Sequence, residues 1–343
     1  MKRMRSSGGS GVRSSRGMRF LGSFVPACVW MGLASGFVGG CGEGFDPASM
    51  INSLRVVGVQ ADKPYPKPGE RVSLEMLWHD GKSPVDSPRT VQIAWLGGCT
   101  NPIGDYFSAC FLQLAEQFGR VEKDPSLFET LFGFGETFQF DVPSDIISSR
   151  PQLEGMDPYG LSYVFFAVCA GNLRAAEPGD DGLPFGCFDE VGNRLGSNDF
   201  LPGYLGLYTF LERTNANPIL NGLMINGNLL DPNEMPTFPR CSKDSCRKLK
   251  LKASVDPSSA ETNTGLYDAK GKVMSEQMWV EYLTTGGKVN SGPRLVNDAT
   301  KGWNEDNGVD YKPPEEAGKQ FVFAVVRDNR GGVAWVKQAV MFE

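Results

Sequence analysis

Short runs in which apolar and polar residues alternate recur between residues 54 and 341, and glycine or proline separates many of them. In one run, Val72, Leu74 and Met76 alternate with polar residues. Such alternation puts one face of an extended strand in a core and the other in water. The chain contains 42 Gly and 23 Pro, which keep the runs short, so the pattern predicts an all-β protein.

The runs fall into two groups, each long enough for one domain. The first group has predicted strands at 54–59, 71–78, 91–95, 138–142, 163–169 and 204–211. The second group has them at 219–225, 248–255, 278–283, 321–326 and 333–341. The last two strands form a predicted hairpin, because Gly331 and Gly332 can supply the positive φ angles of its turn. Residues 214–218 indicate a linker, so we expect domains at 51–213 and 219–343.

The two groups also look like a distant internal repeat. Residues 165–172 parallel residues 322–329, and residues 93–98 more loosely parallel residues 280–287. Because the matches occur in the same order in both halves, we expect one kind of domain to occur twice.

One stretch of the first group has helical spacing. Between residues 111 and 132, Leu114, Phe118 and Val121 follow one another at intervals of three or four residues. After Pro125, Ser126 is a candidate cap for a second helix. The pattern predicts one or two short helices inserted between strands.

The number of strands, their spacing and the terminal hairpin resemble immunoglobulin-like β-sandwiches, similar to modules of bacterial surface proteins. The resemblance covers residues 50–343 and implies two tandem sandwiches with a short helical insertion in the first. The inter-sheet disulfide of antibody domains is not matched, because the strand at 71–78 holds no Cys.

The first forty residues have the order of an export signal. Residues 1–19 contain six Lys or Arg and no acid, and residues 20–37 are mainly apolar. Gly39 and Gly40 then precede Cys41, and the first acid of the chain is Glu43. A basic, then apolar, then small sequence is typical of a secretory signal, so we expect residues 1–40 to be removed.

Val38-Gly39-Gly40-Cys41 resembles the lipobox of bacterial lipoproteins. The resemblance implies cleavage between Gly40 and Cys41, a diacylglycerol on the Cys41 thiol and an acylated amino terminus. Residues 41–50 would then be a tether, since two or more acyl chains hold a protein firmly on a membrane. Gly42, in place of Asp, favours the outer membrane. The alternatives are a second box that ends at Cys28 and an uncleaved anchor over residues 20–40, which are about long enough to span a bilayer.

The charge of the mature chain argues against nucleic acid as a partner. Removing the six basic leader residues leaves 28 Lys and Arg against 40 Asp and Glu, a net charge of −12. Nucleic-acid binding requires clustered positive charge. The one basic cluster, residues 243–252, fits the solvent face of a strand better.

Six cysteines follow Cys41, and an even number in an exported chain predicts disulfides. Pairing of nearest neighbours closes three short loops that are rich in turn residues. The predicted bridges are Cys99–Cys110, Cys169–Cys187 and Cys241–Cys246. Zinc is the alternative, but no pair has CxxC spacing and the chain has one His.

Catalytic and metal-binding candidates are weak. His79 is the only histidine, and it precedes Asp80 and Gly81, which indicates a turn residue rather than a general base. The acidic loops at 177–182 and 304–310 could offer oxygen ligands to calcium, although neither has EF-hand spacing. Trp303 lies in a polar stretch and is a candidate exposed contact, while the other tryptophans should be core.

These observations predict a non-enzymatic, lipid-anchored envelope protein with a role in binding, adhesion or assembly, and no cofactor. We expect it to face the periplasm or the exterior and to bind an envelope protein or glycan. The alternative is an envelope enzyme, such as a glycan hydrolase that uses two carboxylates.

Overall fold

The computed structural model describes residues 47–343, except 85–86, 125, 127, 152–154, 156, 176–184, 263–264 and 291. The predicted leader, both candidate lipid-bearing cysteines and the start of the tether lie outside these residues. The described residues belong to one compact unit. Within them, no helix is long and apolar enough to cross a membrane.

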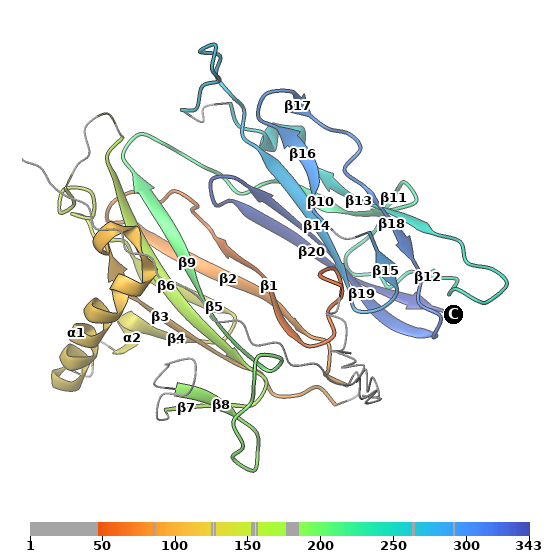
Figure 1. Ribbon diagram of the computed structural model, residues 1–343, viewed down its shortest axis with the longest axis horizontal. Coiled ribbons are helices and arrows are strands. Elements are labelled where there is room, and N and C mark those ends of the chain that lie inside the picture. The colour runs from red at the N-terminus through yellow and green to blue at the C-terminus, as the bar shows by residue number, and fades with distance from the viewer. Residues whose placement is uncertain are drawn as a thin grey trace, which may run out of the picture. The chain divides into compact units, whose positions relative to one another are not determined.

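The first sandwich consists of two antiparallel sheets. One sheet has the order β1-β2-β5, with β1 Leu54–Ala61, β2 Arg71–Asp80 and β5 Thr137–Asp141. The other has the order β4-β3-β6-β9, with β4 Phe132–Phe134, β3 Gln92–Thr100, β6 Tyr159–Cys169 and β9 Phe200–Phe210. A separate hairpin pairs β7 Asn172–Ala175 with β8 Phe185–Phe188. Figure 1 shows these elements together with the helical insertion.

The predicted helices are confirmed as α1 Cys110–Lys123 and α2 Phe128–Leu131. Two short 3-10 turns, Ile103–Asp105 and Phe107–Ala109, lead into α1. The insertion therefore lies between β3 and β4, on the sheet that also contains β6 and β9.

The second sandwich also consists of two sheets. One has the order β11-β10-β13-β18-β15, with β11 Asn228–Leu229, β10 Leu220–Ile225, β13 Leu249–Val255, β18 Val309–Lys312 and β15 Lys288–Val289. The other has the order β12-β20-β19-β14-β16-β17, with β12 Thr237–Phe238, β20 Val333–Phe342, β19 Gly318–Asp328, β14 Met278–Thr284, β16 Arg294–Asp298 and β17 Gly302–Trp303. A 3-10 turn covers Pro257–Ser259. Among the described strands, β12 and β20 form the one parallel ladder, and a single parallel bridge joins Met50 to Thr284 of β14.

Both sandwiches have the immunoglobulin-like strand order. The sheets β1-β2-β5 and β10-β13-β18 correspond to strands A, B and E of that fold. The sheets β4-β3-β6-β9 and β16-β14-β19-β20 correspond to strands C′, C, F and G. The fold is thus all-β with tandem immunoglobulin-like sandwiches, as the sequence predicts.

The internal repeat holds at the level of strands, but one of the matches is out of register. Ile93 pairs with Val168 in the first sandwich, and Val280 pairs with Val326 in the second. Ile93 and Val280 match in the sequence, so their pairing partners Val168 and Val326 occupy equivalent positions in the two sandwiches. The sequence match of 165–172 with 322–329 instead aligns Val168 with Val325, so it is wrong by one residue. The matched apolar runs are continuous, so their composition did not show which face each residue occupies.

Each core forms where alternating residues of the two sheets meet. In the first sandwich Trp95 is 1% exposed and its indole donates to the carbonyl of Gly135. In the second, Tyr282 occupies the matching position of β14, and its hydroxyl lies 2.7 Å from the backbone nitrogen of Ala253. A buried aromatic residue on strand C is typical of immunoglobulin domains.

The two sandwiches pack on one another through a second apolar layer. Phe323 and Val325 of β19 point away from their own core and contact Val57 of β1. As a result, residues 322–326 of β19 are fully buried on both faces. Gly58 contributes to this packing, because a Cβ there would lie 3.1 Å from the ring of Trp335.

The predicted linker is held by polar contacts to both sandwiches. Asn217 donates from Nδ2 to the carbonyl of Ala61 and accepts at Oδ1 from the backbone N–H of Val333. The carbonyl of Thr214 accepts from the guanidinium of Arg330. These bonds tie residues 214–217 to the β19–β20 turn, so the linker has a defined path.

Candidate binding surface

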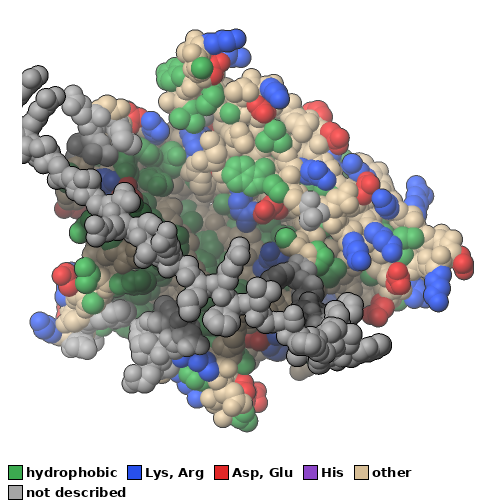
Figure 2. Space-filling view, viewed as in Figure 1, with side chains coloured by type: hydrophobic (Ala, Val, Ile, Leu, Met, Phe, Trp, Pro, Cys, Tyr) green, Lys and Arg blue, Asp and Glu red, His purple; other side chains and the backbone are tan. Residues whose placement is uncertain are grey.

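An aromatic surface covers the outer face of the sheet formed by β3, β6 and β9. We define it as Tyr163 and Phe165 of β6, Tyr204 and Tyr208 of β9, and Phe107 and Phe111 of the insertion. Tyr204 and Tyr208 are 48% and 42% exposed, and Phe111 is 54% exposed. Figure 2 shows hydrophobic side chains gathered on the side of β6 and β9, whereas charged side chains are interspersed over the second sandwich.

The rings of this surface contact one another. Tyr204 stacks on Phe107, with centroids 4.4 Å apart, and contacts Tyr163 edge-on at 5.6 Å. Phe165 lies 6.3 Å from Phe111. Strand alternation produces the arrangement, since the even-numbered residues of β9 from 202 to 208 point outward and are exposed.

A disulfide and an ion pair hold the insertion against the sheet. Cys99 of β3 is bonded to Cys110 at the start of α1, with Cα atoms 5.5 Å apart. Arg150 donates two hydrogen bonds to the carboxylate of Asp105, at 2.7 and 2.8 Å, and the hydroxyl of Tyr159 donates a third. The hydrogen bond from Arg150 holds the pKa of Asp105 below its ordinary value. Phe107 and Phe111 are therefore presented by an anchored loop.

Such a surface is suited to binding by stacking and apolar contact. Tyr and Phe offer large areas at little cost in side-chain entropy, and they are enriched in protein interfaces. The sequence pattern did not predict this surface, because most aromatic residues alternate with polar ones and were expected in the core. The sequence did contain one sign of this surface, because none of the eleven residues of β9 is charged.

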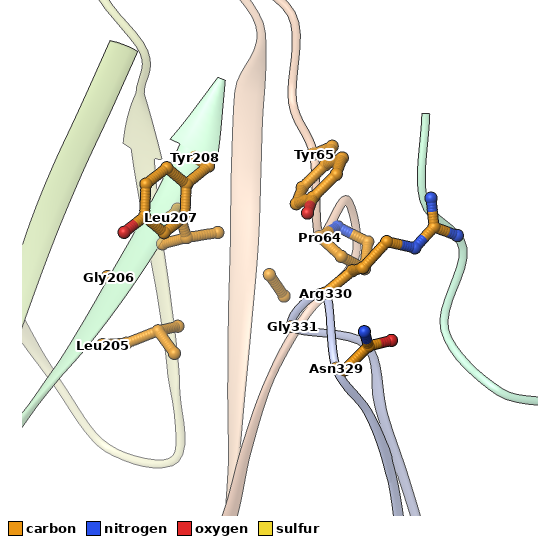
Figure 3. A pocket seen from close by; sticks show the side chains of 10 residues that line it. Pro64, Tyr65, Leu205, Gly206, Leu207, Tyr208, Asn329, Arg330 and Gly331 are labelled. Atoms are coloured by element: carbon orange, nitrogen blue, oxygen red, sulfur yellow. The ribbon is translucent and has the colours of Figure 1, made fainter. Parts of the chain in front are cut away.

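A cavity of about 180 Å³ lies beside the surface, along the edge of β9. Leu205 to Tyr208 of β9 line one side, and Ala61, Pro64 and Tyr65 line another. Asn329, Arg330 and Gly331 of the β19–β20 turn complete it. Figure 3 shows the residues of β9 on one side of this space and Tyr65 with the turn on the other.

A buried ionic cluster lies behind the cavity wall. The guanidinium of Arg330 donates to Glu276 at 2.7 Å and also to Glu261. Burial, together with the negative charge of Asp328, raises the pKa of Glu276 to about 7. The two glutamates are engaged by Arg330, so the cluster holds the turn in place.

The three predicted disulfides are confirmed. Besides Cys99–Cys110, Cys169 at the end of β6 is bonded to Cys187 of β8. Cys241 is bonded to Cys246. The first two bridges link neighbouring elements of the first sandwich, and the third closes a loop between β12 and β13 of the second. Lipidation at Cys41 and cleavage after Gly40 lie outside the described residues.

The assignments of His79 and Trp303 were wrong. His79 belongs to β2 rather than a turn, and its ring contacts Phe321 and Phe323 of the second sandwich. Burial and the nearby Lys337 lower its pKa to about 4. Trp303 is partly buried against the core of the second sandwich rather than exposed. In both cases a distant segment covers the residue.

The acidic loop at 304–310 faces lysines. Lys252 lies 3.3 Å from Glu305, Lys250 lies 3.8 Å from Asp306, and Lys248 lies 3.6 Å from Asp310. Lys250 and Lys252 of the basic cluster thus lie on the polar face of β13, as predicted, whereas Lys248 immediately precedes the strand. The other candidate calcium loop, 177–182, lies outside the described residues. Among those described, no group of three or more His, Cys, Asp or Glu could hold a metal ion.

No family model matches the chain, and neither does any curated protein. Among solved structures, fibronectin(III)-like modules of Clostridium thermocellum CbhA match at TM-score 0.20 and 9% identity, over 83% of this chain and 93% of that one. The D0-D1 domain of Intimin matches at TM-score 0.20 and 10% identity, over 84% and 98%. Tandem Ig repeats of Dlar match at TM-score 0.19 and 7% identity, over 85% and 98%. The strand order, rather than these distant similarities, establishes the fold.

Proposed function

We propose that this protein is a non-enzymatic, lipid-anchored envelope protein that binds a partner protein through its aromatic surface. The single observation that carries the proposal is the contrast between equivalent faces of the two sandwiches. In the second sandwich, the outer face of β14, β19 and β20 is covered by the first sandwich. In the first sandwich, the equivalent face has the aromatic surface, and its rings remain partly exposed.

The buried counterpart supports a protein as the partner of such a face. Phe323 and Val325 are fully buried by side chains of a neighbouring β-sheet, including Val57. Exposed apolar patches of this kind mark interaction sites on soluble domains. A protein partner therefore fits the aromatic surface better than a glycan, which remains the second candidate.

The proposed location rests on the sequence. The leader, the lipobox at 38–41 and Gly42 support a lipid anchor on Cys41, on the outer membrane, facing the periplasm or the exterior. The three disulfides agree with export, because such bonds persist in oxidising compartments. Replacement Cys41→Ala should leave the protein unprocessed or shift it from the detergent phase to the aqueous phase. Normal processing and partitioning of that variant would refute the anchor.

Two carboxylates near the cavity bear on the enzymatic alternative. Glu261 and Glu276 both accept hydrogen bonds from Arg330. Such pairing supports a structural role for them, since a general acid or a nucleophile must be free to meet a substrate.

Site-specific photo-crosslinking in cells tests the proposed surface. A photoreactive phenylalanine analogue at position 204 should yield a crosslinked protein adduct. The same analogue at Tyr267, which is 63% exposed on the second sandwich, is the matched control. Adducts of equal yield at both positions, or none at 204, would contradict the proposal. Sedimentation of the protein with purified cell-wall glycan, lost in a Tyr204→Ser variant, would instead favour the glycan.

A further inference from the structure

We propose that the free edge of β9 binds an uncharged, extended peptide segment of a partner protein by strand addition. The inference rests on the proposed binding function and names the chemistry of its partner. β9 is the last strand of its sheet and pairs only with β6. Within the described residues, no backbone hydrogen bond outside that ladder involves residues 201–209. The outward N–H and C=O groups of β9 are therefore available to another strand.

The other sheet edges of the described residues are short, capped or interrupted by a charged residue. The free edges formed by β4, β5, β11, β12, β15 and β17 are two to five residues long. β1 is longer, but its edge meets the second sandwich. The carbonyl of Val57 accepts from Arg327 at 2.7 Å, and that of Ala61 accepts from Asn217 at 2.7 Å. β20 is paired on its outer side only at Met341 and Phe342, by β12, but its open stretch carries the charged residue Lys337. Among the described strands, β9, with eleven residues, is the long open edge that carries no charge.

The composition of β9 lacks the usual protection of an edge strand. Natural edges carry charged residues or proline that discourage pairing. β9 has no charged residue, and its one proline, Pro202, is third in the strand. The segment from Gly203 to Phe210 can thus pair without interruption. Its lack of charge also selects the occupant, because a charged residue placed opposite Leu205 or Tyr204 would lose water without gaining a counterion.

The cavity beside β9 gives the added strand a specific contact. It opens along Leu205 to Tyr208, and Tyr65 and the β19–β20 turn form its other sides (Figure 3). Its volume of about 180 Å³ is several times the share of one water molecule, about 30 Å³ in the liquid. One apolar side chain of the added strand can enter it. In strand addition, main-chain bonds supply affinity and such pockets supply selectivity.

Hydrogen exchange of the full-length protein in detergent micelles tests the edge directly. Without a ligand, alternate amides between residues 203 and 209 should exchange rapidly, since only one side of β9 is paired. A phage-displayed library of random dodecapeptides should yield binders with uncharged central residues, and these should protect those amides. N-methylation of one set of alternate peptide residues should abolish binding, whereas N-methylation of the other set should not.

Two adjacent proline variants provide a matched pair. Neighbouring residues of a strand direct their N–H groups to opposite sides, so only one of Leu205→Pro and Gly206→Pro removes a bond to β6. The variant that keeps the wild-type melting temperature should bind selected peptides at least tenfold more weakly. If both variants unfold, the exchange and N-methylation results decide alone.

Other outcomes contradict the inference. Selected peptides that leave β9 unprotected would place strand addition elsewhere. Protection that rises with protein concentration and no peptide would show that a second copy covers the edge. A crosslink at position 204 in cells, without protection of β9 by peptides, would refute strand addition and leave the proposed binding function standing. Protection of β9 by peptides, without a crosslink at position 204 in cells, would support strand addition and contradict the proposed binding function.

Discussion

The guanidinium of Arg330 donates from Nε to Oε1 of Glu276 at 2.7 Å, where the two side chains are 5% and 1% exposed. Arg330 lies in the β19–β20 turn and also binds the carbonyl of Thr214 in the linker. The pair therefore sits where the second sandwich meets the connection to the first.

Replacement Arg330→Ala should destabilise the protein by about 3–5 kcal/mol, because it leaves the buried carboxyl group of Glu276 without its partner. Urea unfolding measures the effect. Arg240→Ala is a suitable control, since the side chain of Arg240 is exposed and donates to the carbonyl of Glu315. A loss below 1 kcal/mol for Arg330→Ala would show that the cluster is not structurally required.

Glu276 should make stability depend on pH. Its folded pKa of about 7 exceeds its ordinary value of 4.5, so the folded state holds a proton that the unfolded state releases. The contribution of this group to the free energy of unfolding is present in full below pH 4.5. It is lost as the pH rises to about 7, which lowers the free energy of unfolding by up to about 3 kcal/mol. Unfolding between pH 5 and 8 should show a smaller decline in Glu276→Gln than in the wild type. Equal declines would contradict the assignment.

The three disulfides should contribute unequally. In the loop-closure view, the Cys169–Cys187 bridge, which spans 18 residues, is worth about 3 kcal/mol, and the Cys241–Cys246 bridge, which spans 5, about 2 kcal/mol. Double serine variants, compared by thermal unfolding, should rank in that order. The reverse order would show that local packing outweighs loop length.

Gly58 should be intolerant of larger residues. Gly58→Leu places its side chain against the ring of Trp335 and should cost about 1–3 kcal/mol. Gly119→Ala is the control, because a Cβ at this position of α1 meets no atom within 4 Å. That change should be neutral or stabilise by up to about 1 kcal/mol. A tolerated Gly58→Leu would mean that the sandwiches separate readily.

Local patterns predicted much of the fold. Alternation located strands such as β2 and β13, helical spacing located α1, and short loops indicated all three disulfides. These features depend on residues near one another in the chain, so their signal is present in the sequence. The position of Val168 opposite Ile93 was missed by one residue, because a continuous apolar run contains no alternation to set the register.

The sequence by itself determined the long alternating strands, the all-β class of both domains and the cysteine pairing, since period and spacing are local properties. The tertiary structure decided which apolar faces are covered. Phe323 is buried because β1 and β2 pack on it, whereas Tyr204 at the equivalent face stays exposed. His79 and Trp303 were misassigned for the same reason. Burial depends on what packs on a residue from elsewhere in the chain, and that contact leaves no trace in the residue's own neighbourhood.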